Sequence, residues 1–158
     1  NVFSKKGQGT KFEIYLPASG KAVSAPKKGS EKFVEGRETV MLVDDEDMII
    51  DVGTRMLKKL GYQVFIARDG KEAIEIFKKH PEEIDLVVLD MIMPKMGGGE
   101  TYDRIKKIKP DVKVLLSSGF SINGQASEIL NRGCNGFIQK HFNLQNLSKN
   151  LRAILEGE

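Results

Sequence analysis

The sequence predicts an α/β fold in which a doubly wound, five-stranded parallel sheet carries helices on both faces. From Thr39 onward, short apolar runs alternate with longer segments whose apolar residues recur at helical spacing. Leu86–Leu89 is apolar at every position, which is typical of a strand that is covered on both faces. Five strand–helix units within about 120 residues favour parallel strands joined by crossover helices.

The first two units follow one another directly. The strand Thr39–Val43 precedes a helix over Glu46–Leu60, and Gly61 ends that helix because glycine readily adopts the backbone conformation of a helix stop. Gln63–Ala67 has the composition of a strand. Lys71–His80 carries an apolar stripe at helical spacing and has a proline directly after it, so we expect a second helix there.

The other three units repeat this pattern. The helix after Leu86–Leu89 is expected to end before Pro110, because proline cannot continue a helix. The remaining expected elements are the helix Glu100–Ile108, the strand Val112–Leu116, the helix Ala126–Arg132, the strand Gly136–Gln139 and the helix Leu144–Leu155.

The N-terminal residues differ in composition from the rest. Gly7-Gln8-Gly9-Thr10 is a glycine-rich turn, and Lys11–Leu16 alternates polar and apolar residues as a strand does. The residues that follow are rich in lysine, serine, glycine and alanine, which is typical of a linker. We expect a short segment over 1–17, a linker over 18–36 and the α/β domain over 37–158.

Charge and composition exclude several classes of function. The chain has 158 residues and a net charge of +3, but residues 1–35 hold seven lysines against three glutamates, so residues 36–158 carry about −1. The α/β domain therefore lacks the basic footprint of a nucleic-acid-binding protein. No apolar stretch approaches the roughly 20 residues of a membrane helix. The single cysteine, Cys134, forms no internal disulfide, which suits a reducing compartment.

Chemically active side chains stand at the ends of four predicted strands. These are Asp44-Asp45, Asp90, Ser117-Ser118 and Lys140. Because the carboxyl ends of parallel strands meet at one edge of a sheet, we expect these side chains to lie together. Clustered carboxylates raise one another's pKa unless a cation neutralises them, and Mg²⁺ prefers oxygen ligands. The patch is suited to bind a divalent cation and to accept a phosphoryl group.

Residues 39–156 resemble the receiver domain of two-component signalling systems. The resemblance rests on the acidic pair Asp44-Asp45, on Asp90 in the segment Leu-Asp-Met-Ile-Met-Pro94, on Ser118 before Gly119, and on Lys140. It implies a flavodoxin-like sheet with strand order 2-1-3-4-5. It also implies a signalling switch that takes a phosphoryl group from a phosphohistidine onto Asp90 with Mg²⁺.

The resemblance assigns roles around the metal. We expect Asp45 and Asp90 to bind Mg²⁺ directly and Asp44 to bind it through water, and the family implies a further ligand in the backbone carbonyl of Ile92. Lys140 is expected to neutralise charge on the transferring group.

Other roles concern the response to phosphorylation. Ser118, with Ser117 as the competing candidate, is expected to bond a phosphoryl oxygen, and Phe137 stands where the family keeps an aromatic switch, although simple core packing would also explain it. Apolar Ile92 and Phe120 are expected to hinder hydrolysis and so prolong the phosphorylated state. The family's proline after the lysine is replaced by His141, which leaves the geometry of that peptide bond open.

The segment from Gly7 to Pro17 looks like the closing glycine box and last strand of a histidine-kinase ATP-binding domain. The chain is then expected to be the carboxy-terminal part of a hybrid sensor kinase. The other kinase boxes are absent, so we expect it to catalyse only its own phosphorylation and dephosphorylation. Expected partners are the dimerisation and phosphotransfer domain of a histidine kinase or a histidine phosphotransfer protein, with neither nucleic acid nor membrane contact. The expected location is cytoplasmic, and a membrane anchor in the parent kinase is compatible with it.

Three other functions are less consistent with these residues. A free-standing response regulator is disfavoured by the kinase-like N-terminus. An inert interaction module with the same fold is disfavoured by the complete set of reactive residues. A flavin-binding protein of this topology is disfavoured because the acidic run Asp44-Asp45-Glu46-Asp47 would repel a flavin phosphate.

Overall fold

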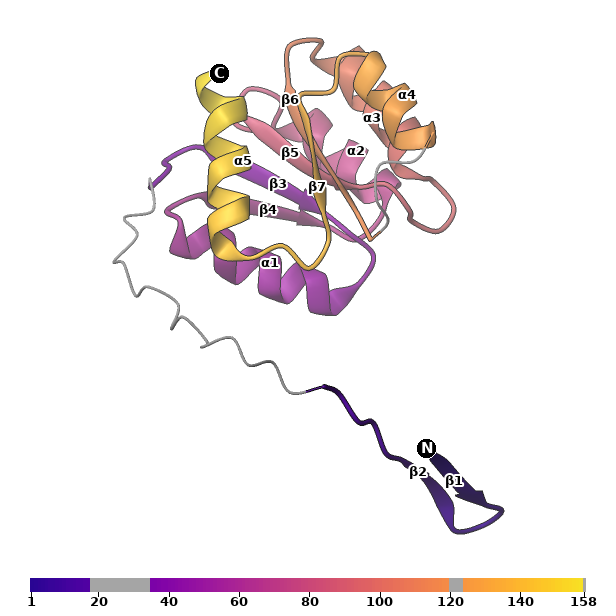
Figure 1. Cartoon of the computed structure of the whole chain (residues 1–158). Coiled ribbons are helices and arrows are strands. Elements are labelled where there is room, and N and C mark those ends of the chain that lie inside the picture. The colour runs from indigo at the N-terminus through magenta and orange to yellow at the C-terminus, as the bar shows by residue number, and fades with distance from the viewer. Residues whose placement is uncertain (18–34, 120–123, 158) are drawn as a thin grey trace. The chain divides into compact units, whose positions relative to one another are not determined.

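The computed structural model describes residues 1–17, 35–119 and 124–157. The chain divides into two units, one that contains a hairpin at the N-terminus and an α/β domain whose described residues begin at Glu35 (Figure 1). The linker predicted over 18–36 lies outside the described residues, apart from Glu35 and Gly36. Among the described residues, no helix combines the length and the hydrophobicity that crossing a bilayer requires.

The α/β domain contains one parallel sheet of five strands. Its strands are β3 (Thr39–Val43), β4 (Gln63–Ala67), β5 (Leu86–Asp90), β6 (Lys113–Ser118) and β7 (Gly136–Gln139). Their order across the sheet is β4-β3-β5-β6-β7, which confirms the predicted order. All neighbouring pairs are parallel. The order reverses between β3 and β5, and this is the place where doubly wound folds form their sites.

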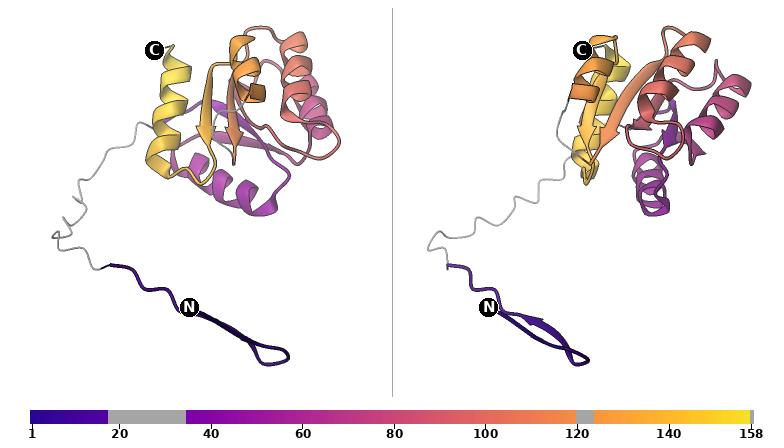
Figure 2. Two further views of the ribbon diagram at one scale, coloured as in Figure 1. Left: turned by 45° about the vertical axis from the view of Figure 1, so that its right-hand side comes forward. Right: turned by 90° about the vertical axis from the view of Figure 1, so that its right-hand side faces the viewer.

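In the described part of the domain, five helices cover the two faces of the sheet (Figure 2). They are α1 (Asp47–Lys59), α2 (Gly70–Lys79), α3 (Gly98–Ile108), α4 (Gly124–Asn131) and α5 (Leu144–Glu156). Residues of α1 and α5 pack against one face of the sheet in one apolar cluster. Residues of α2, α3 and α4 pack against the other face in a second cluster. Because every residue of β5 is buried, this strand forms the centre of the domain, as its apolar sequence predicts.

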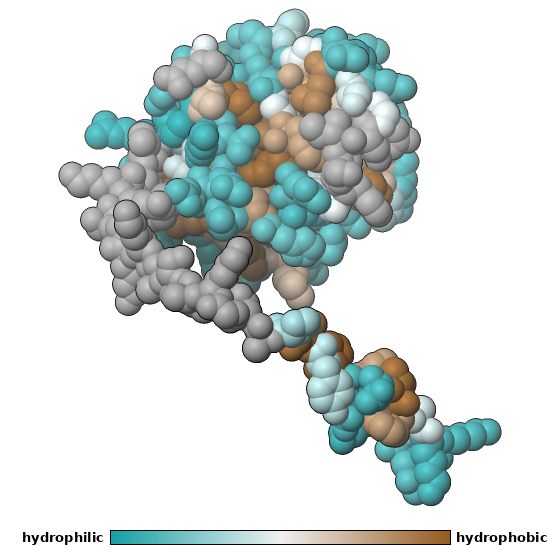
Figure 3. All heavy atoms as spheres, in the orientation of Figure 1, coloured by the Kyte–Doolittle hydropathy of each residue, from teal (hydrophilic) through white to brown (hydrophobic). Residues whose placement is uncertain are grey.

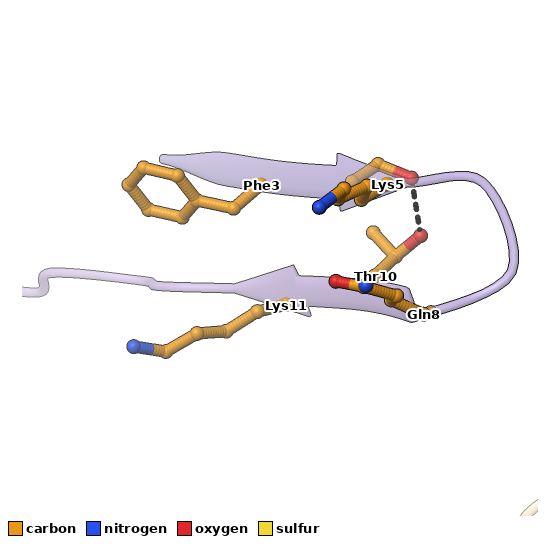
Figure 4. Close-up of a pocket in the computed structure, with 7 residues that line it drawn as sticks. Phe3, Lys5, Gln8, Thr10 and Lys11 are labelled. Carbon is orange, nitrogen blue, oxygen red and sulfur yellow. Dashed lines mark hydrogen bonds between the residues drawn. The ribbon is translucent and has the colours of Figure 1, made fainter.

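The N-terminal unit differs from the predicted single strand over Lys11–Leu16. It is an antiparallel hairpin of β1 (Val2–Lys5) and β2 (Gly9–Phe12), and a side-chain hydrogen bond of 2.8 Å joins Ser4 to Thr10 across the strands (Figure 4). The ladder ends with the pair Val2 and Phe12 and a bond from the Glu13 amide to the Asn1 carbonyl. Within the described residues no strand pairs with the residues after Glu13, and β2 stops earlier than the alternation predicts.

The N-terminal unit leaves its large apolar and aromatic side chains exposed, and the brown spheres of this unit in Figure 3 belong to its aliphatic and phenylalanine residues. The exposed residues are Val2, Phe3, Phe12, Ile14, Tyr15 and Leu16. Val2 and Phe12 are paired across the two strands, so their side chains lie on the same side of the hairpin. A two-stranded hairpin with one uncovered apolar side is stable only when another layer packs on it.

The start of α3 lies unusually close to the end of β5. A β-carbon on Gly98 would stand 2.4 Å from the carbonyl oxygen of Asp90 and 2.7 Å from Cα of Met91. In the observed arrangement, the amide of Gly98 donates a 3.0 Å hydrogen bond to the carbonyl of Met91. Only glycine therefore fits at this position, and α3 begins two residues before the predicted Glu100.

We predict that Gly98→Ala lowers the free energy of unfolding by about 1–3 kcal/mol, because two rigid backbone segments must separate to admit the methyl group. Gly99→Ala is the matched control, since its β-carbon would make an ordinary 3.5 Å contact with Ile129. The control is expected to be neutral or stabilising by up to about 1 kcal/mol, because alanine favours the helix. Urea unfolding of both variants measures the difference, and equal stabilities would contradict the close approach.

Candidate functional site

The sheet brings the predicted site residues to one edge. β3 lies next to β5, so Asp44 and Asp90 leave the sheet side by side. β6 lies on the other side of β5 and pairs Asp90 with Ser117, and β7 follows next to β6. The backbone amide of Lys140 donates a 2.7 Å hydrogen bond to the carbonyl of Ser118, which fixes the start of the lysine relative to β6.

Three carboxylates form a compact acidic group at this edge. Asp44 and Asp90 are almost fully buried, at 1% and 2% exposure, whereas Asp45 is exposed. Each of the three offers an oxygen, and these oxygens all lie within 4.8 Å of one another. A buried pair and an exposed third carboxylate, all at this spacing, form a donor set that suits a hard divalent cation open to water on one side.

Lys140 extends its ammonium group to the two buried carboxylates. Its Nζ lies 3.0 Å from Oδ2 of Asp44 and 3.1 Å from Oδ2 of Asp90. A third contact of 3.1 Å runs to Oε1 of Glu46. The side chains of Lys140, Asp44 and Asp90 are nearly buried, so the two contacts with the aspartates form largely out of water and are stronger than ion pairs on the surface. The Glu46 side chain, in contrast, is 60% exposed.

Burial dominates the electrostatics of the group. It raises the pKa of Asp90 to about 6, although Lys140 acts in the opposite direction. Burial likewise raises the pKa of Asp44, against hydrogen bonds from the Glu46 amide and from Lys140. Burial alone would lower the pKa of Lys140, but its hydrogen bonds to the carboxylates outweigh burial and raise it. One ammonium therefore does not neutralise the carboxylates, and the group retains a deficit of positive charge.

The two serines at the end of β6 are both buried. The carbonyl of Ser117 accepts a 2.9 Å hydrogen bond from the Met91 amide, so β6 holds the chain just after Asp90 in place. Oγ of Ser117 has no hydrogen-bond partner within the described part of the chain. The carbonyl of Ser118 accepts the hydrogen bond from the Lys140 amide, so the backbone of Ser118 lies next to the start of the lysine.

The remaining residues named by the sequence analysis lie as follows. Ile92 follows β5 and is 52% exposed, and Phe137 is half-buried against the cluster under α2, α3 and α4. Phe120 lies outside the described residues. The peptide bond before His141 is trans, as are the other peptide bonds of the described segments, and His141 takes a positive φ of 68°.

Glu46 was not singled out by sequence reasoning. The only signal was its place in the acidic run that follows β3, and that run does not say which of its side chains turns toward the site. Its contact with Lys140 depends on how far β7 brings the lysine across the edge of the sheet, which is a property of the folded domain.

Comparison with known proteins agrees with this geometry. Residues 40–152 match the family model described as "Response regulator receiver domain". The sensor kinase CckA of Brucella abortus is 36% identical over 98% of this chain, which spans 17% of that relative.

Solved structures give the same family. A response regulator receiver domain protein from Clostridium thermocellum has a TM-score of 0.73 at 28% identity, with 76% of this chain and 95% of that one covered. The CheX-CheY-BeF3-Mg²⁺ complex of Borrelia burgdorferi matches with a TM-score of 0.71 at 26% identity, over 74% of this chain and 88% of that one.

Receiver domains generally bind Mg²⁺ at an acidic pocket and interact with the kinases and phosphotransfer proteins of two-component systems, and this chain has a cluster of three aspartates at the edge of its sheet. The family match covers the sheet from the second residue of β3 onward and all four strand ends of the site. The chain belongs to the response regulator receiver domain family and is homologous to the CheY-like phosphoryl-accepting domains of two-component signalling systems.

Proposed function

We propose that this domain takes a phosphoryl group from a phosphohistidine of a partner onto the carboxylate of Asp90. The observation that carries the proposal is the burial of Asp90 at the end of the central strand, with the ammonium of Lys140 3.1 Å from its Oδ2. Burial weakens the hydration of this carboxylate, and the ammonium stands where the negative oxygens of an arriving phosphoryl group need positive charge.

The transfer exchanges one bond to phosphorus for another. An oxygen of Asp90 forms a bond to phosphorus while the bond between phosphorus and the imidazole nitrogen breaks, and the electron pair of that bond stays on the nitrogen. Lys140 then lies beside the phosphoryl oxygens and neutralises part of their charge. The product is an acyl phosphate on Asp90, and its charge differs from that of the free carboxylate.

We propose that Asp45 and Asp90 hold Mg²⁺ directly, that Asp44 does so through water, and that the backbone carbonyl of Ile92 is a further ligand. The donor set fits, because three carboxylate oxygens lie within 4.8 Å and hard oxygen donors are those that Mg²⁺ prefers. When bound, Mg²⁺ supplies positive charge that offsets the carboxylates and the phosphoryl oxygens. The Borrelia burgdorferi complex of CheX and CheY includes Mg²⁺, which supports a Mg²⁺ site in this fold.

The response to phosphorylation is assigned to two further residues. Ser118 is proposed to donate its hydroxyl hydrogen to a phosphoryl oxygen, because the carbonyl of the same residue already binds the Lys140 amide. Phe137 is proposed to change its side-chain orientation when Ser118 moves. Its half-buried position on β7, next to the start of the strand's pairing with β6, allows such a change.

We propose further that residues 1–17 are the last part of a histidine-kinase ATP-binding domain and that the parent protein is a hybrid sensor kinase. Two observations support this proposal. The alignment with CckA covers 98% of this chain and so includes the hairpin. The hairpin also exposes an apolar side that the remainder of a larger domain would cover. Expression with the upstream sequence tests the proposal, because Phe12 and Ile14 should then become protected from solvent, and continued exposure would contradict it.

The acceptor is tested with acetyl phosphate and Mg²⁺. We expect the wild type to gain one phosphoryl group and Asp90→Asn to gain none, as read by intact-protein mass spectrometry. Asp111→Asn is the control, since Asp111 is exposed and precedes β6 at the other edge of the sheet. It should be labelled like the wild type. Equal labelling of Asp90→Asn and the wild type would show that another residue is the acceptor.

The lifetime of the phosphorylated state tests the role of Ile92. Its exposed apolar side chain cannot orient a water molecule for attack on phosphorus, so we expect phospho-Asp90 to persist beyond seconds. Ile92→Asn should shorten the lifetime by up to about tenfold, since one water contact of about 1.4 kcal/mol corresponds to that factor. Val52→Asn on α1, also an exposed apolar residue, should leave the decay unchanged. Decay of the wild type within seconds, or equal decay of Ile92→Asn, would refute this role.

A further inference from the structure

Glu46 precedes the first residue of α1, but its side chain does not cap that helix. It is the N-cap residue of α1, yet its side chain makes no hydrogen bond to the first turn of that helix. The N-caps of α2 and α5, Asp69 and Asn143, do accept hydrogen bonds from their helices. N-cap positions favour short polar side chains such as these because they satisfy free amides. Glutamate at this position therefore departs from the local rule, and such departures concentrate at functional sites.

The side chain of Glu46 contacts Lys140 instead. Its Oε1 lies 3.1 Å from Nζ, and its own backbone amide donates a 3.0 Å hydrogen bond to Oδ1 of Asp44. Asp44 uses its other oxygen, Oδ2, for the same ammonium at 3.0 Å. Glu46, Asp44 and Lys140 thus form a closed ring of contacts at the edge of the sheet.

The ammonium of Lys140 has three N–H donors, and three carboxylates surround it. Transfer of a phosphoryl group to Asp90 changes only one of these acceptors, because Asp90 then becomes part of an acyl phosphate. The contacts with Asp44 and Glu46 are not consumed by the reaction. They leave the ammonium anchored at two points while its third hydrogen changes partner.

We propose that Glu46 is a positioning residue for phosphoryl transfer: with Asp44 it anchors the ammonium of Lys140, so that a single N–H passes from the Asp90 carboxylate to the incoming phosphoryl oxygen. This inference rests on the proposed function of Asp90. It assigns Glu46 no contact with the metal and none with the phosphoryl group. Glu46 acts through Lys140 and through the order that it imposes on that side chain.

A purely electrostatic role predicts the opposite effect. The negative charge of Glu46 would repel an anionic donor, so every neutral replacement would accelerate the reaction. Positioning requires an acceptor atom rather than a charge, and the amide oxygen of glutamine provides one. Glu46→Gln and Glu46→Ala therefore separate the two roles. The Glu46 side chain is 60% exposed, so its ion pair with Lys140 is weakened by water. Loss of this ion pair should change the rate of phosphorylation by no more than about fivefold.

The experiment measures the rate of phosphorylation by acetyl phosphate at saturating Mg²⁺ in the full chain. Asp51→Asn is the matched control, since Asp51 is an equally exposed carboxylate, at 61%, further along α1 and paired with Arg55. We expect Glu46→Ala to react about three- to fivefold more slowly, and Glu46→Gln and Asp51→Asn to react like the wild type. Equal rates for Glu46→Ala and Asp51→Asn, or faster reaction of both Glu46 variants, would overturn the proposal.

A second readout needs neither metal nor phosphoryl group. The ¹H–¹⁵N signal of a lysine ammonium is observed when hydrogen bonds slow its exchange with water. In the metal-free protein, we expect the Lys140 signal in the wild type, Glu46→Gln and Asp51→Asn, and its loss in Glu46→Ala. An unchanged signal in Glu46→Ala overturns the positioning role. If the wild type takes no phosphoryl group, the proposed function fails, and this signal still decides whether Glu46 anchors Lys140.

Discussion

The interaction on which the site depends is the sharing of one ammonium, that of Lys140, by the buried carboxylates of Asp44 and Asp90. It joins the ends of three strands that lie far apart in the sequence. Without it, two carboxylates would stand together in a poorly hydrated place, which is strongly unfavourable. The ammonium neutralises only part of their charge. The remaining deficit makes the site receptive to a divalent cation, and the same ammonium serves the phosphoryl group that the reaction brings.

Much of this arrangement follows from the sequence because each reactive residue directly ends an apolar run. A run such as Leu86–Leu89 is typical of a buried strand, and in a parallel sheet its end lies at the same edge as the ends of its neighbours. The positions of Asp44, Asp90 and Lys140 relative to one another could therefore be predicted from spacing and strand order. The role of each residue in phosphoryl transfer came from the family resemblance rather than from spacing.

Other features depend on contacts that the sequence does not encode locally. Gly98 begins α3 because the helix approaches the backbone of β5 too closely for a side chain, and a glycine in the sequence does not reveal that neighbour. The side chain of Glu46 turns to Lys140, 94 residues further along the chain, instead of capping its own helix. The pairing of Val2–Lys5 with Gly9–Phe12 was missed because residues before the glycine-rich turn form too short a run to show alternation.

The central claim is that uncompensated carboxylate charge makes the folded domain responsive to a cation. The most direct test compares the free energy of unfolding of the wild type with that of Asp90→Asn. Because folding raises the pKa of Asp90 from 3.8 to about 6, the folded state binds more protons between about pH 4 and 6, and wild-type stability falls as the pH rises through that window. At about pH 7.5 without metal, Asp90→Asn should be the more stable protein by about 1–3 kcal/mol, a difference that closes toward about pH 4. Mg²⁺ should stabilise the wild type and have much less effect on the variant. A metal-free wild type as stable as Asp90→Asn, or equal stabilisation of both by Mg²⁺, would contradict the account.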